Sequence, residues 1–116
     1  MKGSILIVED ECFGESFKKI FEEENYFVIL YKNGLEAIDQ IENGLIYELA
    51  IIDLSLPLID GEEVIKTSKE INPNIPVLSF SGYSHKPKNS DRHITKPIFT
   101  EDLIKIIDDY FSKKEL

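Results

Sequence analysis

The chain has 116 residues, of which 42% are hydrophobic and 30% charged, which excludes a disordered chain or a disulfide-stapled mini-protein. Acidic residues outnumber basic ones 22 to 13, and the formal net charge of -9 argues against nucleic acid or an anionic membrane as a partner. The single Cys12 favours a reducing, cytoplasmic setting, and no segment approaches the roughly 20 apolar residues that span a bilayer. We expect one domain over residues 1–116.

The hydrophobic runs alternate between two patterns along the chain. Short apolar runs predict strands over residues 4–8, 27–31, 49–54, 76–80 and 93–95. Between and after them, apolar residues at helical spacing predict helices over residues 13–21, 35–41, 61–70 and 100–111. Strands that alternate with helices predict an α/β fold, a doubly wound five-stranded parallel sheet in the flavodoxin-like order 2-1-3-4-5.

The connection between the fourth and fifth strands departs from this pattern. Residues 83–92 are polar, contain Pro87 and include Tyr83 as their one large apolar residue, so they cannot bury the face of a helix. We therefore expect a loop in place of the fourth helix.

Acidic side chains follow two strands that end at the same edge of the predicted sheet. Glu9, Asp10 and Glu11 come directly after the first strand, and Asp53 lies near the end of the third. Clustered carboxylates attract a cation, and hard oxygen ligands suit Mg²⁺ or Mn²⁺ better than zinc. A solvated loop with a helix-capping acid is the simpler interpretation of Glu9 and Asp10. It does not extend to Asp53, because an aspartate in an apolar strand needs a partner.

Four segments, in this order, resemble the receiver domain of two-component response regulators over essentially the whole chain. Each segment is weakly specific alone, but their order makes the signal specific. They are the acidic residues Glu9-Asp10-Glu11, the run Asp53-Leu54-Ser55-Leu56-Pro57 with Asp60-Gly61 behind it, Ser81-Gly82 after the fourth strand, and Thr95-Lys96-Pro97 after the fifth.

The resemblance implies a role for each residue of the site. Asp53 would be the phosphoacceptor, taking a phosphoryl group as an acyl phosphate. Mg²⁺ would be bound directly by Asp10, Asp53 and the backbone carbonyl of Ser55, and through water by Glu9. Lys96 would pair with the phosphoryl oxygens.

The resemblance also implies a switch next to the site. The Ser81 hydroxyl would swing to a phosphoryl oxygen, and the residue three positions before the lysine, here His93, would report the phosphorylation state. A partly exposed strand residue is the simpler interpretation of His93. The resemblance further suggests a cis peptide bond between Lys96 and Pro97.

The implied partners are a sensor histidine kinase or a histidine phosphotransfer protein as donor, and an unknown downstream protein. Such a domain promotes its own phosphorylation and dephosphorylation, so we do not class it as an enzyme. Two alternatives stay open. One is a receiver-like interaction module that is never phosphorylated. The other is a Mg²⁺-dependent phosphatase with an aspartate nucleophile, which would need a second aspartate where this chain has Ser55.

Overall fold

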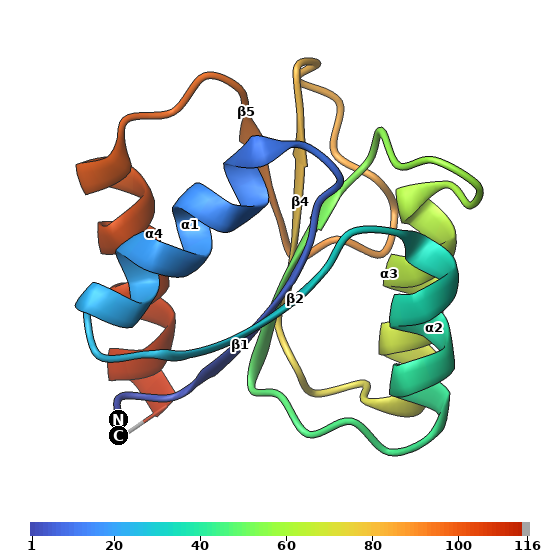
Figure 1. Ribbon diagram of the computed structural model, residues 1–116, viewed down its shortest axis with the longest axis horizontal. Coiled ribbons are helices and arrows are strands. Elements are labelled where there is room, and N and C mark those ends of the chain that lie inside the picture. The colour runs from blue at the N-terminus through green and yellow to red at the C-terminus, as the bar shows by residue number, and fades with distance from the viewer. Residues whose placement is uncertain (115–116) are drawn as a thin grey trace.

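The computed structural model describes residues 1–114 and contains five parallel strands in the order β2-β1-β3-β4-β5 (Figure 1). The strands are β1 (Ser4–Val8), β2 (Phe27–Tyr31), β3 (Leu49–Asp53), β4 (Val77–Ser81) and β5 (Arg92–Thr95), and the helices are α1 (Cys12–Glu23), α2 (Gly34–Glu42), α3 (Gly61–Ile71) and α4 (Thr100–Lys114). The predicted fold class and strand order are confirmed. No helix within the described residues is long and apolar enough to cross a membrane.

Helices cover both faces of the sheet and divide the core into two layers. Figure 1 shows α1 and α4 on one face and α2 and α3 on the other. Alternate residues of β1 serve the two layers, because successive side chains of a strand point to opposite faces. Ile5 and Ile7 pack in the layer under α1 and α4, and Leu6 and Val8 pack in the layer under α2 and α3. Every residue of β3 is buried, as expected for a central parallel strand.

The start of α3 is held close to the end of β3. The Asp60 side chain caps the helix by accepting a hydrogen bond from the Glu62 amide at 3.1 Å. A Cβ atom on Gly61 would lie 2.1 Å from the carbonyl oxygen of Asp53, so only glycine allows this approach. The two contacts set the position of the β3 end, where the site lies.

The connection from β4 to β5 is a loop, as predicted. Residues 82–91 contain no helix. Pro87 is buried and lines, with Glu62 and Ile65 of α3, a small cavity of about 30 Å³. The Asp91 amide donates to the Val77 carbonyl at 2.8 Å, which ties the end of the loop to the start of β4. The loop thus covers the part of the sheet that a fourth crossover helix would cover.

Candidate functional site

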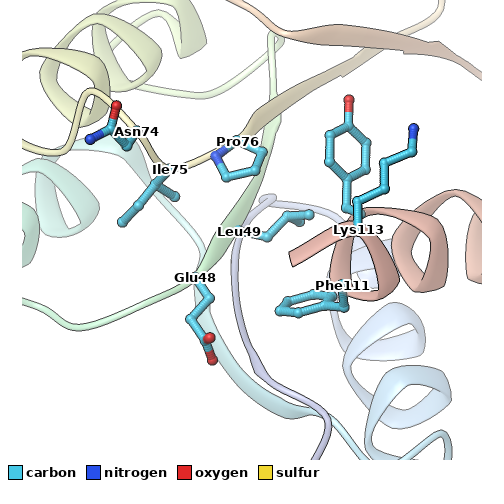
Figure 2. A pocket seen from close by; sticks show the side chains of 8 residues that line it. Glu48, Leu49, Asn74, Ile75, Pro76, Phe111 and Lys113 are labelled. Atoms are coloured by element: carbon cyan, nitrogen blue, oxygen red, sulfur yellow. The ribbon is translucent and has the colours of Figure 1, made fainter. Parts of the chain in front are cut away.

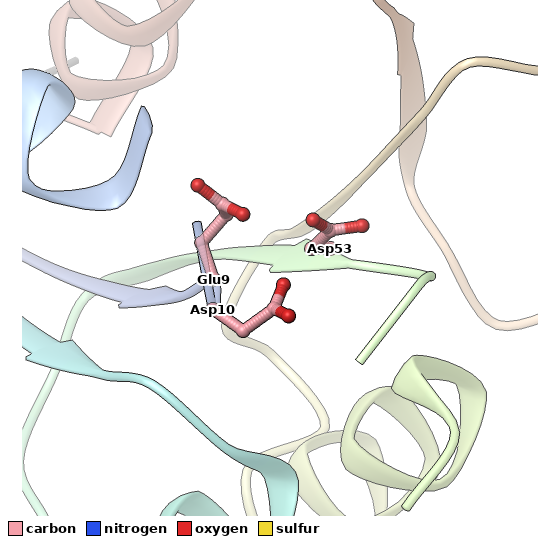
Figure 3. Close-up of side chains that lie close together, drawn as sticks. All are labelled: Glu9, Asp10 and Asp53. Atoms are coloured by element: carbon pink, nitrogen blue, oxygen red, sulfur yellow. The ribbon is translucent and has the colours of Figure 1, made fainter. Parts of the chain in front are cut away.

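Three carboxylates converge at the ends of two adjacent strands. Asp53 is the last residue of β3, and Glu9 and Asp10 follow β1 directly. One oxygen from each carboxylate lies within 4.8 Å of those of the other two, and Figure 3 shows the three side chains gathered around a common space. Parallel pairing of β1 with β3 brings these ends together, as the sequence predicts.

Asp53 is almost fully buried, with 1% of its surface exposed, and each of its carboxylate oxygens has a partner. Lys96 Nζ lies 3.1 Å from Oδ2, and the Ser55 amide donates to Oδ1 at 2.8 Å. The lysine ammonium also lies 4.8 Å from the ring centroid of Phe80 and 5.6 Å from that of Phe13, so aromatic faces help to orient it. The Lys96–Pro97 peptide bond is cis, as the resemblance suggests.

Glu9 is 2% exposed, and its two oxygens have different surroundings. Oε1 accepts a hydrogen bond from the Glu11 amide at 3.0 Å, whereas Oε2 is buried without a hydrogen-bond partner among the described residues. Burial raises the pKa of Glu9 to about 7, and the neighbouring Asp53 carboxylate adds to the rise. The Glu11 amide and the charge of Lys96 oppose it.

The donor set fits a hard divalent cation. Three carboxylates share the site with one lysine, so its acidic charge is only partly balanced. A buried carboxylate oxygen without a partner costs free energy that a cation would offset. Asp10 is exposed, which leaves the space open to solvent on one side. Carboxylate ligands that leave room for water are what Mg²⁺ prefers in proteins.

Among the described residues, Ser81 and His93 make no hydrogen bond to the Asp53 side chain. Ser81 ends β4 and is buried, and its hydroxyl donates to the Tyr83 carbonyl at 2.9 Å. His93 is half-buried, as its simpler interpretation requires, but both of its ring nitrogens have hydrogen-bond partners. The Ser55 carbonyl stays a prediction, since the contact found here is made by the Ser55 amide.

Sequence reasoning missed Ser79 and Ser90, whose hydroxyls lie 2.8 Å apart beside His93. Ser79 stands two residues before Ser81 in one strand, so both side chains point to the same face. The sequence therefore shows that Ser79 shares a strand face with Ser81. It does not show that Ser79 pairs with His93, because that pairing depends on the register of β4 against β5.

A separate cavity of about 450 Å³ lies at the opposite end of the sheet, next to Leu49, the first residue of β3 (Figure 2). Pro76, Tyr110 and Phe111 are among the residues that line it. None of the predicted site residues lies there, so the cavity is separate from the acidic cluster.

Sequence comparison identifies a family over most of the chain. Residues 5–108 match the response regulator receiver domain. The polar-differentiation response regulator DivK of Brucella anthropi is 31% identical over 120 residues, covering 95% of this chain and 97% of DivK. Two other curated relatives, YkoG of Bacillus subtilis and RppA of Synechocystis, are longer, and the chain spans about half of their length.

Solved structures agree with the sequence match. A CheY-like response regulator receiver domain protein from Methanospirillum hungatei has a TM-score of 0.87 and 28% identity, covering 97% of this chain and 96% of that one. The response regulator TrrA of Thermotoga maritima, solved in complex with Mg²⁺-BeF, has a TM-score of 0.82 and 26% identity. The match covers 92% of this chain and 97% of the TrrA chain.

Proposed function

The chain belongs to the response regulator receiver domain family, and on that premise we propose that Asp53 accepts a phosphoryl group in two-component signalling. The observation that carries the proposal is the Asp53 carboxylate itself, which is buried at the end of β3 and paired with Lys96 at 3.1 Å. Membership of this family makes the chain a signalling domain and not a classical enzyme. We also propose that residues 1–116 form a single receiver domain that acts in the cytoplasm.

The donor is a phosphohistidine of a sensor histidine kinase or of a histidine phosphotransfer protein. An Asp53 oxygen attacks phosphorus, the phosphorus–nitrogen bond breaks, and the imidazole nitrogen leaves with the electron pair of that bond. The product is an acyl phosphate on Asp53. Lys96 changes partner in this step, from the carboxylate oxygen to an oxygen of the transferred group, and the Ser81 hydroxyl supplies a second donor.

Magnesium is the cofactor that the donor set favours. Asp10, Asp53 and the Ser55 carbonyl would hold Mg²⁺ directly, and Glu9 would hold it through water. When bound, the ion neutralises charge on the phosphoryl oxygens and lowers the repulsion among the carboxylates. The complex of the Thermotoga maritima relative with Mg²⁺-BeF supports this assignment.

The output is a change of shape at Ser81 and His93 that a downstream protein reads, or transfer of the phosphoryl group to another protein. Either route uses the surface around the site. The unphosphorylated interaction module is the competing function, and it needs no acceptor chemistry at Asp53.

Labelling by a small phosphodonor tests the proposal. The chain is incubated with acetyl phosphate, with and without Mg²⁺, and its intact mass is measured. We expect one added phosphoryl group, only with Mg²⁺, in the wild-type chain and in Asp60→Asn, whose substituted side chain is exposed and still able to cap α3. Asp53→Asn is expected to remain unlabelled. Failure of the wild-type chain to label, beside a receiver that labels fully, would favour the interaction module.

A further inference from the structure

The sheet carries polar side chains where the loop 82–91 replaces a helix. Ser79 and Ser81 of β4 and His93 of β5 are hydrogen-bonded to loop residues Ser90 and Tyr83. Figure 1 shows the loop on the side of the sheet where α3 lies. Their strand neighbours Phe80 and Ile94 point to the other face and pack under α1 and α4. Hydrogen bonds therefore replace apolar packing on this part of the sheet.

The contacts of His93 define the orientation and the protonation of its ring. Nε2 lies 2.5 Å from the Tyr83 carbonyl oxygen, and a carbonyl can only accept, so Nε2 carries a proton and donates it. Nδ1 lies 2.7 Å from Ser79 Oγ and is hydrogen-bonded to it. Ser90 Oγ supports Ser79 at 2.8 Å and donates to the Arg92 carbonyl at 2.8 Å. The imidazole is thus held between β4 and the loop.

The Tyr83 backbone connects this ring to Ser81. The Tyr83 amide donates to Ser81 Oγ at 3.1 Å, and the Ser81 hydroxyl donates back to the Tyr83 carbonyl at 2.9 Å. A hydroxyl has one hydrogen to donate, so Ser81 has none left for a group on Asp53. His93 Nε2 lies 3.1 Å from the same hydroxyl and donates to the same carbonyl, which anchors that carbonyl over Ser81.

We propose that His93 is a positioning residue for Ser81: its ring, held by Ser79, keeps the Tyr83 carbonyl against the Ser81 hydroxyl and so keeps that hydroxyl from the acceptor site. The inference rests on the proposed function, in which Ser81 donates to the group on Asp53. Before it can do so, Ser81 must release the Tyr83 carbonyl. Release is easier when the carbonyl is not anchored. His93 therefore slows the phosphorylation of Asp53.

Rates of labelling by acetyl phosphate with saturating Mg²⁺ test the proposal. His93→Leu, which keeps the bulk and loses both hydrogen bonds, is expected to label about 2- to 10-fold faster, the factor that one net hydrogen bond represents. His93→Gln, which can still donate to the Tyr83 carbonyl, is expected to label at the wild-type rate. Thermal unfolding of each variant establishes that it is folded at the assay temperature.

A double-mutant comparison separates positioning from a general loss of packing. In the Ser81→Ala background the hydroxyl is gone, so adding His93→Leu is expected to leave the rate unchanged. An equal acceleration in both backgrounds would overturn the proposal, as would an unchanged or slower rate for His93→Leu alone. Failure of the wild-type chain to label would overturn the proposed function together with this inference, whereas normal labelling without a His93 effect would overturn the inference alone.

Nitrogen-15 NMR of the imidazole gives a readout that does not depend on labelling. We expect a proton on Nε2, because the Tyr83 carbonyl beside it can only accept a hydrogen bond. Ser79→Ala is expected to shift the Nδ1 resonance, because it removes the hydroxyl that is hydrogen-bonded to that nitrogen. A ring protonated on Nδ1 alone would contradict the assigned contacts.

Discussion

Replacing Glu9 by glutamine is expected to remove a pH dependence of stability. The pKa of Glu9 rises from the ordinary 4.5 to about 7 in the folded chain, chiefly because the side chain is buried. Between these values the folded chain holds a proton that the unfolded chain has lost, so without Mg²⁺ stability falls as pH rises. At 1.36 kcal/mol for each pKa unit, the full loss is about 3 kcal/mol. Glutamine stays neutral, so Glu9→Gln lacks this loss.

Urea denaturation in the presence of a chelator, repeated at intervals from about pH 4.5 to pH 8, measures the effect. The informative quantity is the difference in unfolding free energy between the wild-type chain and Glu9→Gln at each pH. We expect this difference to shift by about 3 kcal/mol in favour of the variant across the interval. Glu11→Gln is the matched control, since it removes the same charge at an exposed position two residues away. If the wild-type and Glu9→Gln curves run parallel, Glu9 does not hold the extra proton.

Lys96→Met leaves the buried Asp53 carboxylate without its ion pair, and we expect urea denaturation to show a loss of about 3 kcal/mol; a loss under about 0.5 kcal/mol would contradict this. Gly61→Ala places a Cβ atom 2.1 Å from the Asp53 carbonyl and is expected to lower the unfolding free energy by about 1–3 kcal/mol. Gly82→Ala, where a Cβ meets no atom within 4 Å, is its control, and equal losses would refute the steric argument. Mg²⁺ at a hundred times its dissociation constant for the wild-type chain is expected to stabilise that chain by about 2.7 kcal/mol, measured by thermal unfolding. The same Mg²⁺ concentration is expected to stabilise Asp10→Asn much less. Equal Mg²⁺-induced stabilisation of the two chains would exclude Asp10 as a ligand.

The fold could be predicted because its strands and helices depend on local patterns. The run over β3 is apolar apart from Asp53, which is the pattern of a strand covered on both faces. The helix predicted over residues 35–41 forms as α2, and Asn33 caps it by accepting a hydrogen bond from the Glu36 amide at 2.8 Å. The loop 82–91 was equally predictable, because a segment with Tyr83 as its one large apolar residue has no face to bury.

Contacts between distant residues could be predicted only in part. The meeting of Glu9, Asp10 and Asp53 follows from the rule that neighbouring parallel strands end at one edge. The buried, unpartnered Oε2 of Glu9 does not follow, because it depends on how the chain turns after β1. The bond between Ser79 and His93 likewise requires the register of β4 against β5, which no local pattern encodes.

The missing helix and the polar strand faces are two aspects of one feature. Where α2 and α3 cover the sheet, β1 and β3 present Leu6 and Ile52 to them. Where the loop replaces a helix, β4 and β5 present Ser79 and His93, and the loop residues Ser90 and Tyr83 supply hydrogen-bond partners for these polar groups. Hydrogen bonds are directional, so when the Ser81 hydroxyl donates to a different acceptor, its present partners Tyr83 and His93 must rearrange. Under the proposed function, phosphorylation therefore reaches the surface through the bonds of His93 and Tyr83 and not through repacking of a helix.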